Sequence, residues 1–349
     1  MSQLHPKVLV FRFSSFGDVL QSLSIAGCIK EQWKNAEIHF CTREDFVPLF
    51  QSHSDIQKVW SISKKGSWRE LIHLAQTLRA ENWTHIYDCH NNLRSRVICY
   101  FLNGFLGFRK WIRGHQFLRR PIYRWKRFLL FRFRWNLFPK PFSGQGALLK
   151  PLEKWGLRAA SPSTPQLYFS LDFNKEVEKK LKPQFPQKFV ALAPSAAFLL
   201  KRWPLNYFKE VIQSMAHIDF VILGGPEDTF ASELVEVAPE RVFNWIGQLS
   251  LLESAWVVAQ STALVANDTG LMHVAEQVGR PCVALMGPAP FGFPSRVTTR
   301  VLERELDCRP CSKHGQGPCI NKETYQKCLV DILPAEVIEC LKAFGVDND

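Results

Sequence analysis

A polar turn within residues 263–273 (ALVANDTGLMH) holds the side chains best suited to bind a substrate. An apolar run precedes this turn and a helical pattern follows it. The first turn of a helix presents unpaired N–H groups and a positive dipole end, which bind phosphate. Thr269, Gly270 and Leu271 would supply those groups, while Asp268 could accept hydrogen bonds from sugar hydroxyls. The turn therefore predicts a phosphate–sugar ligand such as a nucleotide sugar, and the alternative is an ordinary helix cap without a ligand.

Three other turns carry candidate residues. Asp18, in the turn SSFGD, would lie in the first turn of a helix, where it could be a general base or simply favour the helix. Lys201 follows a turn at Ser195 and could neutralise a leaving diphosphate. Glu227 follows Gly-Gly-Pro and could bind ribose hydroxyls, although a lone surface glutamate is usually only solvated.

Short apolar runs alternate with helical patterns in both halves of the chain. Runs typical of buried strands lie near Val59 and at residues 8–13, 38–41, 86–89, 189–193, 220–223, 263–266 and 282–286. This alternation predicts an α/β fold with parallel sheets, in which ligands bind beyond the carboxyl ends of the strands. The candidate residues all follow such runs.

Motifs of several other enzyme classes are absent from the sequence. It has no G-x-G-x-x-G, Walker A, H-E-x-x-H or G-x-S-x-G pattern. These absences weigh against dinucleotide-binding enzymes, P-loop ATPases, zinc proteases and α/β-hydrolases. A D-x-D pattern occurs only at residues 347–349, in the terminal tail, which is a poor place for a metal–diphosphate site.

The excess positive charge of the chain lies in one segment. The 349 residues include 44 Lys and Arg against 32 Asp and Glu, a formal net charge of +12. Residues 89–152 contain 14 of the basic residues and no acidic one, so the rest of the chain is close to neutral. The hydrophobic content of 46% excludes a disordered chain. No apolar run approaches the ~18 residues of a membrane span.

Cations and aromatic rings interleave between residues 94 and 140, as in YRWKRFLLFRFRW at 123–135. This mixture fits binding to single-stranded nucleic acid, where rings stack on bases. It equally fits a membrane-surface element, where rings and leucines insert and cations meet anionic head groups. The third interpretation is a solvated helix that packs its aromatic rings on the protein core.

Four of the ten cysteines have the spacing of a metal site. Cys308, Cys311, Cys319 and Cys328 form C-x2-C-x7-C-x8-C, which could hold structural zinc in a tetrahedral site. The alternative is a set of small loop thiols. We find no secretory signal pattern, so we expect a cytosolic protein whose cysteines start as thiols.

The ordered motifs resemble those of the ADP-heptose:lipopolysaccharide heptosyltransferase family (glycosyltransferase family 9). They are RFSSFGDV at 12–19, KRWP at 201–204, GGP at 224–226, NDTGLMH at 267–273 and GP at 287–288. The resemblance implies a GT-B fold, in which two Rossmann-like domains face each other across a cleft. It also implies inverting transfer of heptose to a lipopolysaccharide core, with no cofactor or metal required for catalysis. Residues 196–200 (AAFLL) are more apolar than the family pattern.

The resemblance assigns roles to the candidate residues. Asp18 matches the family's general base, and Lys201 matches the lysine at the diphosphate. Residues expected to contact the nucleotide sugar are Ser195, Glu227, Asp268, Thr269, Gly270, Leu271 and His273. We expect His273 to pack or cap the site and not to act as a base.

Given this resemblance, we favour an acceptor and membrane-surface role for the basic segment over nucleic-acid binding. The expected partners are an ADP-sugar donor, an anionic lipid-linked saccharide acceptor and the inner-membrane surface, with no nucleic acid. The expected location is peripheral, on the cytoplasmic face of the inner membrane. The expected acceptor and membrane patch consists of Arg113, Arg119, Arg120, Arg124, Lys126 and Arg127.

We expect residues 1–165 to form an acceptor-binding domain that includes the basic aromatic segment 94–140. Residues 185–333 would form the ADP-sugar-binding domain, and residues 334–349 a terminal helix and tail. Two alternatives stay open: transfer of a different nucleotide sugar to a surface glycan, and a non-catalytic membrane- or nucleic-acid-binding protein. Residue patterns do not specify the sugar, the linkage or the oligomeric state.

Overall fold

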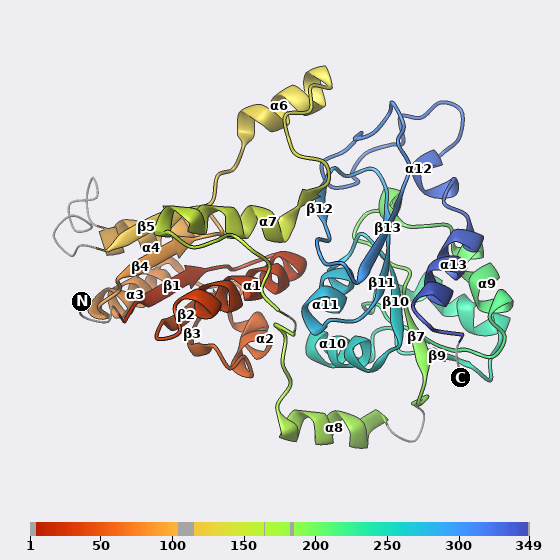
Figure 1. The fold of residues 1–349 in the computed structure, drawn as a ribbon, viewed down its shortest axis with the longest axis horizontal. Helices are drawn as coiled ribbons and strands as arrows, with labels where there is room; N and C mark the ends of the chain where they lie inside the picture. The colour runs from red at the N-terminus through yellow and green to blue at the C-terminus, as the bar shows by residue number, and fades with distance from the viewer. Residues whose placement is uncertain (1–4, 104–114, 164, 182–184, 348–349) are drawn as a thin grey trace. The chain divides into compact units, whose positions relative to one another are not determined.

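The computed structural model describes residues 5–103, 115–163, 165–181 and 185–347. The chain forms two compact units (Figure 1): the first holds residues 1–124 and 144–168, and the second holds residues 125–143 and 169–349. This division differs from the expected one. Residues 125–143 group with the second unit and not with the N-terminal domain, and the terminal helix is part of the second unit.

The first unit is built on a five-stranded parallel sheet with the strand order β3-β2-β1-β4-β5. Its central strands β1 and β4 are buried on both faces, apart from Lys7 at the start of β1. The strands are β1 (Lys7–Phe11), β2 (Glu37–Arg43), β3 (Ile56–Ile62), β4 (His85–Asp88) and β5 (Gln116–Arg119).

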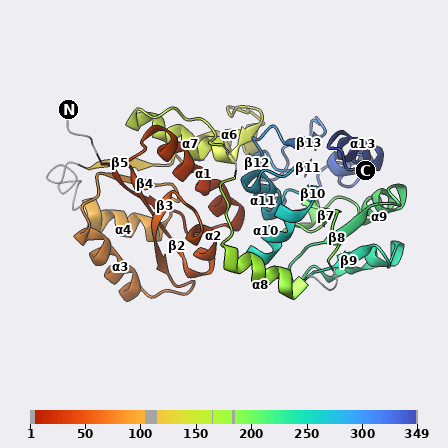
Figure 2. The same ribbon diagram turned by 60° about the horizontal axis from the view of Figure 1, so that its bottom comes forward.

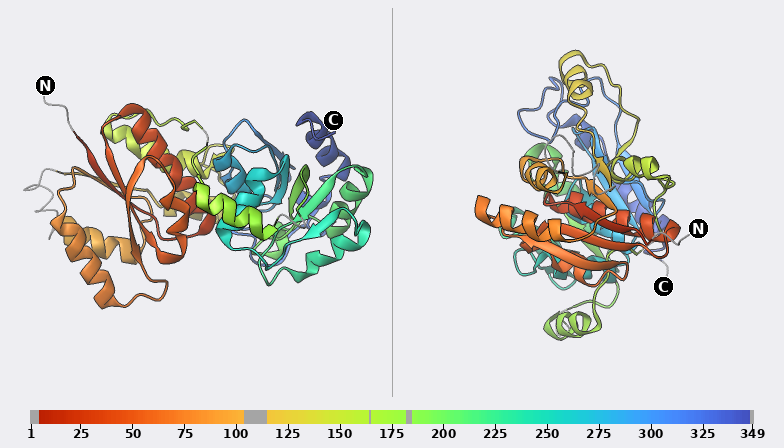
Figure 3. Two further views of the ribbon diagram at one scale, coloured as in Figure 1. Left: turned by 90° about the horizontal axis from the view of Figure 1, so that it is seen from below. Right: turned by 90° about the vertical axis from the view of Figure 1, so that its left-hand side faces the viewer.

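Helices cover both faces of this sheet. Helices α1 and α7 pack together on one face, and α3 and α4 pack together on the other (Figures 2 and 3). A core cluster joins Leu9 and Phe11 of β1 to Leu71 and Leu74 of α3. The helices of this unit are α1 (Phe16–Gln32), η1 (Glu44–Phe46), α2 (Pro48–Gln51), α3 (Trp68–Ala80), α4 (Leu93–Asn103), α7 (Gly144–Leu149) and η3 (Lys150–Trp155).

The second unit contains a six-stranded parallel sheet with the order β13-β11-β10-β7-β8-β9. Its strands are β7 (Phe189–Ala193), β8 (Asp219–Ile222), β9 (Val242–Asn244), β10 (Ala263–Asn267), β11 (Cys282–Met286) and β13 (Thr299–Glu303). Every residue of β7, β10 and β11 is buried, as the sequence predicts. A separate short ladder pairs β6 (Phe142–Ser143) with β12 (Phe291–Phe293).

Helices α10 and α11 lie on one face of this sheet, and α9 and α13 lie on the other. Ser250 and Glu253 form the expected capping box of α10, and Gly279 ends α11 at a φ of 76°. The helices are α6 (Arg124–Phe133), α8 (Leu171–Leu181), η5 (Leu199–Lys201), α9 (Leu205–Ser214), η6 (Thr229–Val237), α10 (Leu251–Gln260), α11 (Gly270–Val278), α12 (Lys327–Val330) and α13 (Pro334–Ala343). No helix in the described part of the chain is long and apolar enough to span a membrane.

The strand order reverses once in each sheet. In the first unit the chain moves outward from β1 to β2 and β3, and then returns so that β4 pairs with the other side of β1. In the second unit β10 returns in the same way to the free side of β7. The loops after the two central strands therefore leave in opposite directions, which opens a crevice for ligands at their carboxyl ends.

A buried histidine makes the stability of the first unit depend on pH. His85, at the start of β4, is 6% exposed and contacts the rings of both Trp33 and Trp155. Burial lowers its pKa to about 4. Between pH 6.5 and 4 the unfolded chain therefore binds a proton that the folded chain does not, so stability falls as the pH falls through this window.

We expect His85→Asn to reduce the loss of unfolding free energy between pH 6.5 and 4 by up to about 3 kcal/mol, because the substitution removes the titrating group. Urea unfolding at several pH values between 4 and 7 measures the slope. The exposed His73, substituted in the same way, is the matched control. A slope in His85→Asn equal to that of the unmodified chain would contradict the prediction.

Candidate functional site

The crevice of the second unit brings together two residues that the sequence singled out separately. Lys201 ends η5 in the loop after β7, and Asp268 follows β10, the neighbour of β7 in the sheet. The Lys201 Nζ atom lies 2.5 Å from Asp268 Oδ2, and the two side chains are only 14% and 12% exposed. Limited access to water strengthens this ion pair relative to a surface pair. The pair places one cation and one carboxylate side by side at the strand ends.

Asn267 is a site residue that the sequence analysis missed. It is fully buried, and its Nδ2 atom donates to the carbonyl of Pro194 at 2.7 Å. Its Oδ1 atom accepts from the backbone N–H of Trp203 at 3.0 Å. One side chain therefore ties the β10 loop to both ends of the β7 loop that carries Lys201. A polar residue at the end of the apolar run 263–266 is the sequence signal that could have identified it.

The N-terminus of α11 begins next to this ion pair. Thr269 is the N-cap residue, but its side chain makes no capping hydrogen bond, and Asp268 pairs with Lys201. Neither side chain is therefore an ordinary helix cap. The N–H groups of the first turn, at Gly270 and Leu271, belong to a nine-residue helix and carry the positive end of its dipole.

The other expected nucleotide-sugar residues lie in different surroundings. Ser195 is half-buried in the loop after β7, and Glu227 is exposed in the loop after β8. In that loop the neighbouring Asp228 is the buried acid, and its Oδ2 atom accepts from the N–H of Gly225 at 2.8 Å.

His273 is buried within α11 and contacts the carboxylate of Glu276 at 3.1 Å. His273 thus packs inside the unit, and its expected contact with the nucleotide sugar stays a prediction.

The crevice of the first unit contains Asp18. This residue lies in the first turn of α1, as predicted, and its Oδ2 atom is 2.5 Å from Nη2 of Arg12 and 3.0 Å from the Ser15 hydroxyl. Arg12 is 4% exposed and also donates to the carbonyl of Cys89 at 3.0 Å. Arg12 therefore holds the Asp18 carboxylate in place and links the loops after β1 and β4. The sequence analysis did not single out Arg12, although a charged residue inside the apolar run 8–13 is a clear signal.

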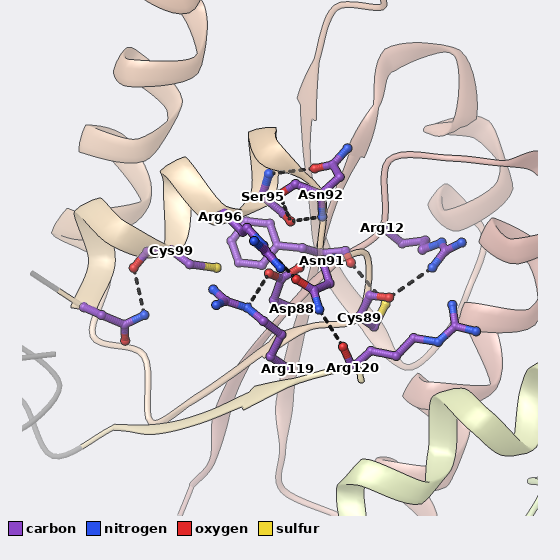
Figure 4. Close-up of polar contacts among 12 residues, drawn as sticks. Arg12, Asp88, Cys89, Asn91, Asn92, Ser95, Arg96, Cys99, Arg119 and Arg120 are labelled. Carbon is purple, nitrogen blue, oxygen red and sulfur yellow. Dashed lines mark hydrogen bonds and ion pairs between the residues drawn. The ribbon is translucent and has the colours of Figure 1, made fainter. Parts of the chain in front are cut away.

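A buried acid organises the neighbouring strand ends of the first unit (Figure 4). Asp88, at the end of β4, is fully buried and binds Nε of Arg119 at 3.0 Å and the N–H of Asn91 at 2.7 Å. Asn91 in turn donates to the carbonyl of Arg120 at 2.7 Å and accepts from Nε of Arg96 at 2.9 Å. Arg119 was expected to present its charge to an acceptor. Its ion pair with Asp88 neutralises that charge.

His90 lies beside Asp18 and was also missed. Its ring packs edge-on against Phe13 at 5.6 Å, and its buried Nδ1 atom has no hydrogen-bond partner among the described residues. Burial, with help from the charge of Arg12, lowers its pKa to about 4. His90 is therefore uncharged near neutral pH.

The basic aromatic segment is exposed along α6 and the residues that follow it. Trp125, Phe128, Phe133 and Trp135 are 74%, 50%, 49% and 64% exposed. This exposure contradicts the interpretation that these rings pack on the core. Two rings, Phe131 and Phe138, do contact Phe291 of β12 and attach the segment to the second unit.

Cations lie between the exposed rings. Arg124 and Lys126 of α6 are exposed, and the guanidinium of Arg127 lies 5.3 Å from the ring of Phe291. Arg120 is half-buried in the first unit, and Arg113 lies outside the described residues. The expected patch is therefore divided between the two units, with Arg119 and Arg120 in the first and Lys126 and Arg127 in the second.

All ten cysteines are free thiols. Among the described residues, no group of three or more His, Cys, Asp or Glu side chains is already arranged to hold a metal ion. The zinc site expected at Cys308, Cys311, Cys319 and Cys328 is therefore not preformed. These four side chains nevertheless line one small cavity.

Comparison with solved structures defines the class of protein. The glycosyltransferase family 9 protein of Veillonella parvula matches with a TM-score of 0.79 and 19% identity, covering 100% of this chain and 99% of that one. The ADP-heptose lipopolysaccharide heptosyltransferase II of Escherichia coli matches with a TM-score of 0.70 and 22% identity, covering 98% and 99%. This likeness shows that the two Rossmann-like units have the GT-B fold, as expected.

The sequence itself identifies the family. The model of glycosyltransferase family 9 (heptosyltransferase) matches residues 71–328, so the chain belongs to this family and is a glycosyltransferase. Lipooligosaccharide heptosyltransferase 2 of Haemophilus influenzae is 24% identical, with coverage of 96% of this chain and 98% of that protein. The resemblance noted in the sequence is therefore confirmed.

We expect Asn267→Ala to lower the free energy of unfolding by about 2–4 kcal/mol, because it leaves a buried N–H and a buried carbonyl unpaired. Urea unfolding measures the loss. The exposed Asn206 of α9, substituted by Ala, is the matched control and should change stability by less than about 0.5 kcal/mol. Equal stabilities of the two variants would show that Asn267 does not tie the two loops.

Proposed function

We propose that this chain transfers a heptose from ADP-heptose to the inner core of lipopolysaccharide. The observation that carries the proposal is the Lys201–Asp268 pair beside the N-terminus of α11, since it joins a cation, a carboxylate and unpaired N–H groups in one crevice. Family membership and the names of the relatives support the sugar and the acceptor class.

The second unit would bind the donor. Lys201 and the α11 N–H groups attract the diphosphate, while Asp268 accepts hydrogen bonds from sugar hydroxyls. As the sugar leaves, negative charge builds on the diphosphate, and these groups stabilise it. Transfer in this form needs no cofactor for its chemistry.

The first unit would supply the base. Asp18 accepts the proton of the acceptor hydroxyl while that oxygen bonds to the anomeric carbon. The bond from this carbon to the diphosphate breaks, and its electron pair leaves with ADP. Attack from the face opposite the leaving group inverts the configuration. Arg12 and Ser15 orient the carboxylate for this step, at 2.5 Å and 3.0 Å.

Asp18→Asn should lower kcat by at least 100-fold and leave ADP affinity within about twofold, because the amide keeps the shape but cannot accept the proton. Lys201→Ala is the matched counterpart and should weaken ADP binding by at least tenfold, since a cation at the diphosphate is lost. Acceptor-dependent ADP release measures turnover, and calorimetry measures ADP binding. Near-normal turnover of Asp18→Asn would remove Asp18 as the base.

The exposed surface of α6 would bind the membrane that presents the anionic acceptor, on the cytoplasmic face of the inner membrane. Exposed rings and cations fit both lipid and single-stranded nucleic acid. The aliphatic Leu137 is also 52% exposed in this segment, and such a side chain inserts among acyl chains but does not stack on bases. We therefore propose anionic lipid as the partner and not nucleic acid.

We expect the protein to bind anionic vesicles with an affinity that decreases as salt is added. Trp125→Ala should lower this affinity about tenfold, because a ring that inserts into the bilayer is lost. Vesicle co-sedimentation at two salt concentrations, with anionic or neutral lipid, measures it. Trp68→Ala is the matched control, since Trp68 is 58% exposed on α3, outside this segment. No preference for anionic lipid, or tighter binding to a single-stranded oligonucleotide, would overturn this part of the proposal.

A further inference from the structure

Four cysteines that the transfer chemistry does not use surround one cavity in the second unit. The side chains of Cys308, Cys311, Cys319 and Cys328 all line a cavity of about 10 Å³. This volume holds one particle of the size of a water molecule. The cavity therefore has the dimensions of a single ion with its ligands around it, and it unites the four residues of the C-x2-C-x7-C-x8-C pattern.

Two of the sulfur atoms already accept hydrogen bonds. The backbone N–H of Gln326 donates to Cys319 Sγ at 3.3 Å, and the side-chain amide of Asn321 donates to Cys308 Sγ at 3.7 Å. Such donors stabilise negative charge on sulfur and are the kind of outer contacts that orient metal ligands. Arg309 and Lys327 also line the cavity, and each is ion-paired, with Glu303 and Asp331 respectively.

The four sulfur atoms would have to move to close on an ion. A Zn–S distance of about 2.3 Å places the sulfur atoms of a tetrahedral site about 3.8 Å apart, which is close to their contact distance. The four thiols are not arranged in this way among the described residues, but they line one cavity, three of them from loop positions and Cys328 from α12.

We propose that Cys308, Cys311, Cys319 and Cys328 bind one structural zinc ion, and that this ion fixes the loop against the donor-site lysine. Four thiolates prefer a soft or borderline metal, and zinc accepts a closed tetrahedral set of four sulfur ligands. Binding releases the thiol protons to solvent, and no oxidant or reductant is involved.

The same loop supports Lys201. Gly315, with a φ of +84°, lies so close that an added Cβ would be 2.8 Å from Cγ of Lys201. The side chain of Gln326 donates to the carbonyl of Leu199 at 2.7 Å, and Leu200 lines the cysteine cavity. Residues of the cysteine-containing segment 308–328 therefore contact all three residues of η5. A zinc ion bound by this segment would hold Lys201 in position at the donor site.

Elemental analysis of the full chain, purified without chelator, tests the metal site. We expect about one zinc ion per chain, and its loss in Cys308→Ser and Cys319→Ser. Cys340→Ser is the matched control, because Cys340 of α13 does not line the cavity, and it should keep the zinc. Absence of stoichiometric metal, or unchanged zinc in Cys308→Ser, would overturn the proposal. If the unmodified chain instead contains iron, and Cys308→Ser and Cys319→Ser lose it, the result would support the thiolate site and overturn zinc as its metal.

A second measurement does not depend on whether the variants fold. The unmodified chain, stripped of metal and titrated with Co²⁺, should develop the visible absorption of tetrahedral cobalt thiolate and protect four thiols from a thiol reagent. An unchanged spectrum would overturn the site. Zinc removal should also weaken ADP binding several-fold, and unchanged ADP affinity would overturn the positioning of Lys201. This ADP measurement rests on the proposed donor site, whereas the metal analysis and the Co²⁺ titration do not.

Discussion

The reversal of strand order in each sheet is the constraint on which both candidate sites depend. Parallel strands must be buried on both faces, so polar groups gather at the strand ends and not along the strands. The reversal separates two neighbouring loops and leaves the ends of the central strands accessible. In the first unit Arg12 and Asp18 follow one central strand and His90 follows the other. In the second unit Lys201 and Asp268 occupy the corresponding positions.

Single buried side chains hold these separated loops together. Asn267 makes hydrogen bonds to both ends of the loop that carries Lys201, and Arg12 joins Asp18 to the carbonyl of Cys89. A buried polar group is costly unless it is paired, so each of these residues defines one arrangement of its loops. The loops that carry the groups proposed to act on substrate are thereby held in place by buried side chains of the same chain.

Local patterns predicted eight of the strands and the separate candidate residues, but not strands β5, β6, β9, β12 and β13. Strands β7 and β11 match their predicted ranges, the capping box at Ser250 is present, and Asp18 lies in the first helical turn. The pairing of Lys201 with Asp268 could not be predicted, because it depends on strand order between residues 67 positions apart. The grouping of residues 125–143 with the second unit has the same cause. It arises from ring contacts with Phe291 and from the short β6–β12 ladder, both of which join distant parts of the chain.

The ion pair between Lys201 and Asp268 also bears on discrimination among anions. A lysine that already has a carboxylate partner at 2.5 Å presents little net charge to a passing anion. A bare phosphate that draws Lys201 away would leave the Asp268 carboxylate stranded in a poorly hydrated position, which is costly. A nucleotide sugar brings a diphosphate for the lysine and hydroxyl groups for the aspartate, so both partners are satisfied together. If the donor binds as proposed, the pair would therefore select against simple phosphates through the free-energy penalty on the wrong ligand.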